Sequence, residues 1–300
     1  LEIGADRPGD IKAITNWLDT RVPTRLTQSQ FHADDRQAGG TGSCAFNQAS
    51  SGCNFSERLA QRRLDRRTIV GGLYERQINA NTVLTMEADY DVKDINQTFT
   101  TITDNINPNY KHYTDLRHYG RLFEMPLRSY VGFFVNNMEQ EGNTFQNLAD
   151  GFGTRGLLLQ KSRSTIRNIG GRIREELDFS PNWTLAGGLG MEQSMLSIQA
   201  TNYAYSDVVA PPNVTVTTTR ASADRTFWNW APEMSLSWKP AEGYRNWIRG
   251  STGYGIPQLN QLTTGIDGNP GTNFNLKPQK NVNIEIGTEG KLSTTFSMHL

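Results

Sequence analysis

Aromatic and basic side chains gather in three stretches of the chain that are otherwise rich in small and polar residues. Aromatic rings stack on flat ligands and attract cations, whereas guanidinium and ammonium groups donate charge-assisted hydrogen bonds to anions. Together they could bind an anionic, aromatic-rich chelate. The alternative is an interfacial aromatic belt whose basic residues pair with lipopolysaccharide phosphates. The residues are Tyr110, His112 and Tyr113, then Arg155, Lys161 and Arg163, then Tyr203, Tyr205 and Arg220.

Both cysteines of the chain, Cys44 and Cys53, lie in one segment rich in Gly, Ser, Asn and Gln. A close, even pair in such a segment predicts a disulfide and an oxidising compartment. Closing a loop of about ten residues would stabilise the fold by roughly 2.5–3 kcal/mol in the chain-entropy model. Two unrelated free thiols are the alternative interpretation.

Enzymatic chemistry finds little support in the residue pattern. The histidines are dispersed, and none has the spacing that collects a metal with cysteines or carboxylates. The chain has no Gly-x-Ser-x-Gly elbow and no phosphate-binding Gly-x-x-x-x-Gly-Lys-Ser/Thr loop, and the glycines at 39–42 read as flexible loop. We therefore predict no enzyme, no cofactor and no metal site. A serine–histidine lipase using His118 on a strand over 113–123 is the catalytic alternative.

The elements that would position these residues are long two-faced strands. Between 226 and 239, apolar side chains occupy the even positions and polar ones the odd positions, as on a strand whose faces differ. Ten residues separate Trp228 from Trp238, about 33 Å along a strand, and a tilt of about 45° projects this to roughly 23 Å. An outer-membrane barrel has an apolar band of about 25 Å. This pattern predicts a transmembrane β-barrel with Met234 and Leu236 facing lipid.

The bulk composition agrees with such strands. The 300 residues are 36% hydrophobic and include 28 glycines, with a mean hydropathy of −0.57. No run of about 18 apolar residues is present, so no transmembrane helix is expected. Lys plus Arg equals Asp plus Glu at 30 each, which gives no electrostatic reason for a nucleic-acid partner. We expect strands over 11–20, 65–77, 82–99, 113–123, 127–141, 164–178, 183–199, 226–239, 245–255 and 281–290.

The polar faces of these strands carry many charges. In a barrel they would line a wet interior, either as cross-strand ion pairs or as contacts to an inserted domain or solute. One exception, Glu175, falls on an apolar face. The predicted interior charges are Glu87, Asp89, Asp91, Lys93, Arg172, Arg174, Glu176, Glu233, Glu285 and Glu289.

The predicted connections alternate between short and long. The short ones fall at 77–81, 124–126, 180–182, 240–244 and around 291, and the long ones at 21–64, 100–112, 142–163, 200–225 and 256–280. Outer-membrane barrels combine tight periplasmic turns with extended extracellular loops, so both cysteines would lie outside the cell. A soluble all-β adhesin or lectin-like sandwich is the alternative, but its strands average five or six residues.

Four short segments occur in a recognisable order: PEMSLSWKP at 232–240, WIRGSTGYGIPQLNQL at 247–262, NLKPQ at 275–279 and NIEIG at 283–287. This succession resembles the TonB-dependent outer-membrane receptors closely over about 55 residues. Two positions depart from the family pattern. Gly255 stands where an Arg often precedes the Ile-Pro pair, and Gln279 stands where a Glu often follows the Pro.

The resemblance implies a 22-stranded barrel around a plug, with an N-terminal segment that engages TonB. Residues 1–300 would be the central part of the barrel, about 10–12 strands, with the plug and the C-terminal strands outside this chain. It implies uptake of a scarce ligand at the bacterial outer membrane, with a ferric siderophore as the first expectation. The alternatives are cobalamin, haem or oligosaccharide uptake, or a passive porin. The implied partners are outer-membrane lipid and lipopolysaccharide, TonB through the missing N-terminal region, and the imported ligand.

Overall fold

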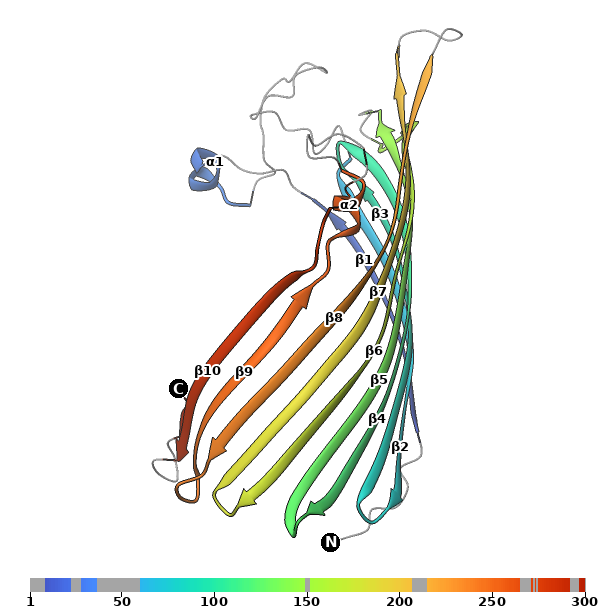
Figure 1. Cartoon of the computed structure of the whole chain (residues 1–300). Coiled ribbons are helices and arrows are strands. Elements are labelled where there is room, and N and C mark those ends of the chain that lie inside the picture. The colour runs from blue at the N-terminus through green and yellow to red at the C-terminus, as the bar shows by residue number, and fades with distance from the viewer. Residues whose placement is uncertain are drawn as a thin grey trace.

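A computed structural model describes residues 9–22, 28–36, 60–148, 152–206, 215–264, 271, 273, 275–291 and 297–299. They form one antiparallel sheet of eleven strands whose spatial order follows the chain from β1 to β11 (Figure 1). This confirms the predicted all-β, antiparallel fold. The elements are β1 Asp10–Arg21, α1 Gln28–Ala33, β2 Arg62–Asn79, β3 Thr82–Thr98, β4 Thr101–Leu122, β5 Met125–Asn147, β6 Arg155–Ser180, β7 Trp183–Tyr205, β8 Val216–Trp238, β9 Tyr244–Gly255, α2 Leu259–Leu262, β10 Gln279–Lys291 and β11 Ser297–His299.

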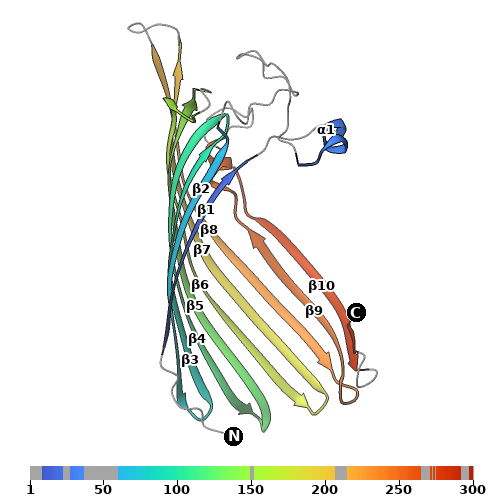
Figure 2. The same cartoon turned by 180° about the vertical axis from the view of Figure 1, so that it is seen from behind.

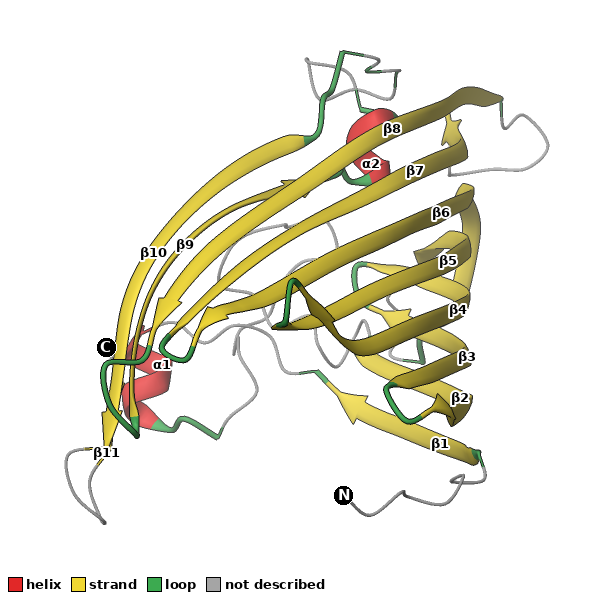
Figure 3. Ribbon diagram, turned by 60° about the horizontal axis from the view of Figure 1, so that its bottom comes forward, coloured by secondary structure: helices red, strands yellow, loops and turns green. Residues whose placement is uncertain are grey.

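The sheet bends into a trough, and α2 lies within its curve in both opposite views (Figures 1 and 2). Leu262 of α2 packs against Leu196, Ile198, Ala223 and Phe227 of β7 and β8. The face that carries these side chains is therefore the inner face. Because side chains alternate along a strand, the register assigns every second residue of each paired strand to the inner or the outer face. Figure 3 shows the same curvature from below.

The outer face is strongly apolar in its lower part, next to the tight turns. Ile284 and Ile286 are each 77% exposed, and Trp228 is 66% exposed. Trp183 and Trp238 stack at 5.8 Å between ring centroids beside the β6–β7 and β8–β9 turns. Contiguous exposure of large apolar side chains is unfavourable in water and typical of a lipid-facing wall edged by aromatic residues.

Several strands extend further than the sequence pattern predicts. β4 begins at Thr101, so the predicted long connection at 100–112 is wrong: only residues 99 and 100 separate β3 from β4. The connections between β5 and β6 and between β7 and β8 are likewise shorter than predicted. Above the apolar band both faces of a strand are polar, so the alternation that marks a half-buried strand disappears although the backbone pairing continues.

The two long connections that remain are those from β1 to β2 and from β9 to β10, and each contains a short helix. Among the described residues, neither helix has the length and apolar character needed to cross a bilayer.

Candidate functional site

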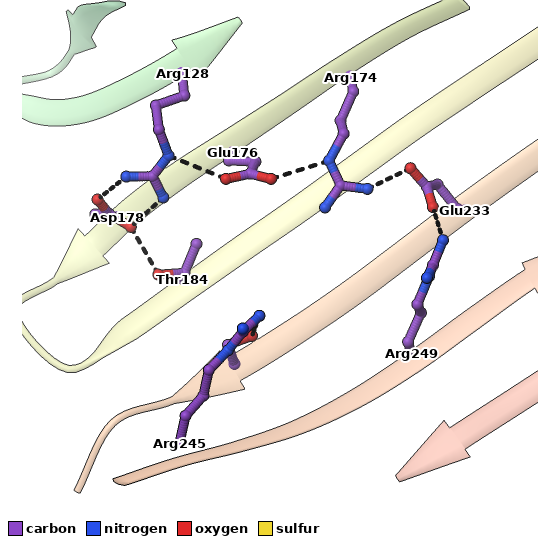
Figure 4. Close-up of polar contacts among 9 residues, drawn as sticks. Arg128, Arg174, Glu176, Asp178, Thr184, Glu233, Arg245 and Arg249 are labelled. Atoms are coloured by element: carbon purple, nitrogen blue, oxygen red, sulfur yellow. Dashed lines mark hydrogen bonds and ion pairs between the residues drawn. The ribbon is translucent and has the colours of Figure 1, made fainter. Parts of the chain in front are cut away.

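The inner face from β5 to β9 carries a chain of ion pairs near the tight turns (Figure 4). The Arg128 guanidinium donates to Glu176 at 3.0 Å and to Asp178 at 2.8 Å. Glu176 also accepts from Arg174 Nε at 3.0 Å. The side chains therefore link two neighbouring strands, with each carboxylate held by charged donors. We call the series of ion pairs that begins with Arg128, Glu176 and Asp178 the inner belt.

The inner belt continues across the next strands. Arg174 Nη1 contacts Glu233 of β8, and the second carboxylate oxygen of Glu233 accepts from Arg249 of β9. Glu233 thus bridges two guanidinium groups. Further along, Arg245 lies 3.7 Å from Glu289, which extends the contacts to β10.

The side chain of Thr184 on β7 closes one end of the inner belt by donating to Asp178 at 2.7 Å. At the other end, Trp247 Nε1 donates to Glu285 at 2.9 Å. The Asp178 oxygen that accepts from Thr184 also accepts from Arg128. Neutral donors thus add to the hydrogen bonds of these carboxylates, as half-buried acceptors require.

A second cluster lies on the inner face of β4, β5 and β6. Tyr130 donates to Asp115, and the Arg172 guanidinium lies 4.8 Å from the Tyr130 ring centroid. Gly132 makes this approach possible, because a Cβ there would lie 2.6 Å from Asp115 Oδ1 and 2.8 Å from the Tyr130 hydroxyl. Asp115 and Tyr130 therefore occupy the space that any side chain at 132 would take.

Above the apolar band, Asp65 of β2 accepts from Arg63 Nε at 3.0 Å and lies 3.3 Å from Lys93 Nζ. The hydrogen bond from Arg63 is the main reason why the pKa of Asp65 lies below its ordinary value. Desolvation opposes this effect, and the Lys93 charge adds to it. A carboxylate held by two cations stays ionised and anchors the wall at this height.

The inner belt is partly exposed to solvent. Side-chain exposure runs from 22% for Glu233 to 47% for Arg245, so each pair stabilises the wall only modestly. The arrangement presents alternating charges to the interior, suited to hydrogen bonding with a polar body placed there. No cluster of three His, Cys, Asp or Glu side chains that could hold a metal occurs within the described ranges.

The structure does not gather the eight predicted ligand-binding residues into one site. Tyr110, His112 and Tyr113 lie within β4, not in a loop. Register places the first two on the outer face and Tyr113 on the inner face, where its ring stacks on Phe134 at 6.4 Å. Their grouping in the sequence therefore reflects adjacent positions on opposite sides of one strand.

The remaining predicted residues lie on the outer face above the apolar band, and several of them have partners. Arg155 contacts Asp104 at 2.9 Å, and Arg163 lies 3.3 Å from Glu141. The Tyr205 hydroxyl donates to the carbonyl of residue 158 at 2.8 Å. Tyr203 and Arg220 lie on the outer faces of β7 and β8 in the paired register. The predicted disulfide between Cys44 and Cys53 falls outside the described residues.

Several belt residues were missing from the sequence prediction. Asp178 continues the period of two set by Arg172, Arg174 and Glu176, so that signal was present in the sequence. Arg128 and Tyr130 also share a face, but the aromatic residues on both faces of 127–141 obscured the alternation. The partner of each charge was not predictable, since Arg174 and Glu233 are separated by 59 residues.

Residues 12–298 match a family model described as TonB dependent receptor-like, beta-barrel. Among solved structures, the closed form of the ferric-catecholate import receptor Fiu from E. coli K12 is similar with a TM-score of 0.69 and 12% identity over 95% of this chain. The ferric citrate transporter FecA in its unliganded form is similar with a TM-score of 0.63 and 14% identity over 94% of this chain. The siderophore receptor PiuA from Acinetobacter baumannii is similar with a TM-score of 0.60 and 12% identity over 94% of this chain.

The match covers 47% of the Fiu chain, 38% of the FecA chain and 45% of the PiuA chain. The chain thus spans less than half the length of these three structures. At such low identity the likeness establishes the fold of the wall and does not transfer a ligand.

Proposed function

Because the chain belongs to the TonB-dependent receptor-like β-barrel family, we propose that the whole protein takes up a scarce ligand across the bacterial outer membrane, with a ferric siderophore as that ligand. The observation that carries the proposal is the division of the sheet. A belt of ion pairs lines the inner face, and exposed Trp, Ile and Met side chains cover the outer face. A lipid-embedded wall around a hydrated interior needs this division.

In this proposal the chain is the central part of the barrel and acts without catalysis. The inner belt would hold a plug. The plug and the extracellular parts of the protein would together capture the ligand. TonB would act through a segment outside this chain. The outer wall would contact outer-membrane lipid, and its upper basic residues, Arg155 and Arg163 among them, would face lipopolysaccharide.

The siderophore component is supported by the kind of protein that shares the fold. PiuA is a siderophore receptor, Fiu is a ferric-catecholate import receptor and FecA is a ferric citrate transporter. Cobalamin, haem or oligosaccharide uptake would use the same wall. A passive porin, the candidate from another class, would use the wall without a plug.

The test is uptake by cells that express the complete protein under iron limitation. Radiolabelled ferric siderophores, cobalamin and haem would each be supplied to cells with and without TonB. We expect accumulation of a ferric siderophore that disappears without TonB. Uptake that persists without TonB would indicate a porin, and TonB-dependent uptake of another ligand would correct the ligand class.

A further inference from the structure

Four polar side chains form a row across the outer face of β3 to β6, where most neighbours are apolar. Thr82 lies opposite His118, and His118 lies opposite Ser129. Ser129 in turn lies opposite Glu175. Thr82 Oγ1 and His118 Nδ1 are hydrogen bonded at 2.9 Å, and the Ser129 hydroxyl donates to the Glu175 carboxylate at 2.5 Å. We call these four residues the outer polar row.

The outer polar row rises from the edge of the apolar band into it. Thr82 is the first residue of β3, directly after a tight turn, whereas Glu175 lies five residues before the end of β6 at Ser180. Five residues at ~3.3 Å each and a tilt of about 45° correspond to roughly 12 Å of height. Phe179 and Trp183 stack near that turn at 6.4 Å, as an interfacial aromatic belt does.

Glu175 has no ion-pair partner in the part of the chain that the structure describes. The arginines next to the row in sequence, Arg128 and Arg174, are directed to the inner face and contact Glu176, Asp178 and Glu233 instead (Figure 4). A carboxylate on a lipid-facing surface is costly unless a cation or strong donors compensate it. One neutral donor, the Ser129 hydroxyl, supplies only part of that compensation.

The space beside this carboxylate is open. Gly187 lies opposite Glu175 on β7, and a Cβ placed on Gly187 would meet nothing within 4 Å. On the far side of that glycine, Met234 of β8 is 60% exposed. The surface is therefore open at Gly187, with Glu175 on one neighbouring strand and Met234 on the other. We call this open position the notch.

We propose that the outer polar row and this notch bind the headgroup of a phospholipid that carries a primary ammonium, of the phosphatidylethanolamine kind. The ammonium group has three N–H donors, which match the carboxylate oxygens of Glu175. The acyl chains would lie along Met234 and Ile173, which is 47% exposed. The single charge and the notch fit one small cation better than the broad surface of a second protein copy.

The experiment is native mass spectrometry of the complete protein in detergent, mixed in turn with phosphatidylethanolamine, phosphatidylcholine and phosphatidylglycerol. Glu175→Gln removes the charge, and Gly187→Leu fills the notch while the carboxylate remains in the chain. Glu242→Gln in the β8–β9 turn is the matched control, because it makes the same chemical change on an exposed residue away from the row. We expect Glu175→Gln to bind phosphatidylethanolamine about tenfold more weakly, as loss of one charge-assisted hydrogen bond requires. Gly187→Leu should weaken this binding as well, because its side chain would occupy the space that the headgroup needs.

The control should bind all three lipids as the native protein does, and phosphatidylglycerol binding should not respond to Glu175→Gln. Equal phosphatidylethanolamine binding by the native protein, Glu175→Gln and Gly187→Leu would overturn the proposal. So would equal binding of the three lipids by the native protein. A change of oligomeric state in Glu175→Gln with unchanged lipid binding would overturn it in favour of a second protein copy. Because the readout is lipid binding, a failed siderophore assay leaves this test unaffected.

Discussion

At the scale of single residues, the inner face depends on side chains that serve two partners at once. Glu233 of β8 accepts from Arg174 of β6 and from Arg249 of β9. These two strands lie on opposite sides of β8 in the sheet. Asp115 accepts from Tyr130 and lies 3.5 Å from Arg172. Removing such a residue leaves two charged or polar groups without their partner, and that cost exceeds the loss of one exposed pair.

Glu233→Gln should therefore lower the free energy of unfolding. Two guanidinium groups lose their shared carboxylate, but Arg249 is 45% exposed and water replaces part of the contact. We expect a loss of about 1–2 kcal/mol, at the upper end for partly exposed pairs. Urea unfolding of the complete protein in lipid vesicles would measure it, with Glu242→Gln as the control. Equal midpoints for the two variants would show that the inner belt does not stabilise the wall.

Gly132→Ala should also destabilise the wall, because its Cβ would displace Asp115, Tyr130 or Arg172 from their mutual contacts. Gly250→Ala is the matched variant, since a Cβ there meets nothing within 4 Å. Replacing glycine by alanine without strain stabilises a protein by roughly 0.4–1 kcal/mol. We expect opposite shifts of the unfolding midpoint for the two variants. Shifts of the same sign would contradict the tight packing around Gly132.

At the scale of elements, β8 shows what sequence can and cannot supply. Its alternation between Trp228 and Trp238 predicts both faces, because the lower half lies between media of different polarity. Above Thr226 no such contrast exists, so the strand continues to Val216 without a signal. The partners of Arg174, Arg128 and the other belt residues could not be predicted for a different reason. Alternation predicts the face that a residue takes, but which residue of another strand lies opposite depends on the geometry of every turn between the two strands.

The height of the lipid boundary on β8 can be tested with one substitution at two depths. Met234→Arg places a charge within the apolar band, where an arginine costs about 2–4 kcal/mol. Thr226→Arg makes a comparable change on the same face above Trp228, where the cost should fall to about 0–1 kcal/mol. Folding stability in lipid vesicles would be measured for both. Equal losses would place Thr226 inside the hydrocarbon and correct the boundary.

At the scale of the whole molecule, the sheet has two edge strands, and an unpaired edge strand is unfavourable in a bilayer. Within the described residues, β1 pairs only with β2 and β11 pairs only with β10. Backbone N–H and C=O groups on a free edge find no hydrogen-bond partner in lipid, and each costs several kcal/mol. The eleven strands are therefore stable in a membrane only when other strands complete the wall. The match to solved structures of which this chain covers less than half agrees with this requirement.

Residues 1–300 expressed alone should consequently fail to insert into lipid vesicles as a monomer. We expect the segment to be degraded by added protease and to migrate identically on a denaturing gel with and without heating. The complete protein should resist protease and migrate differently before and after heating, because a closed barrel stays folded in detergent. Supplying further strands of the complete protein as a second polypeptide would be the positive control, since complementary edges can pair. A protease-resistant monomer formed by residues 1–300 alone would show that the two edges close on each other, and the wall would then be a smaller barrel of eleven strands.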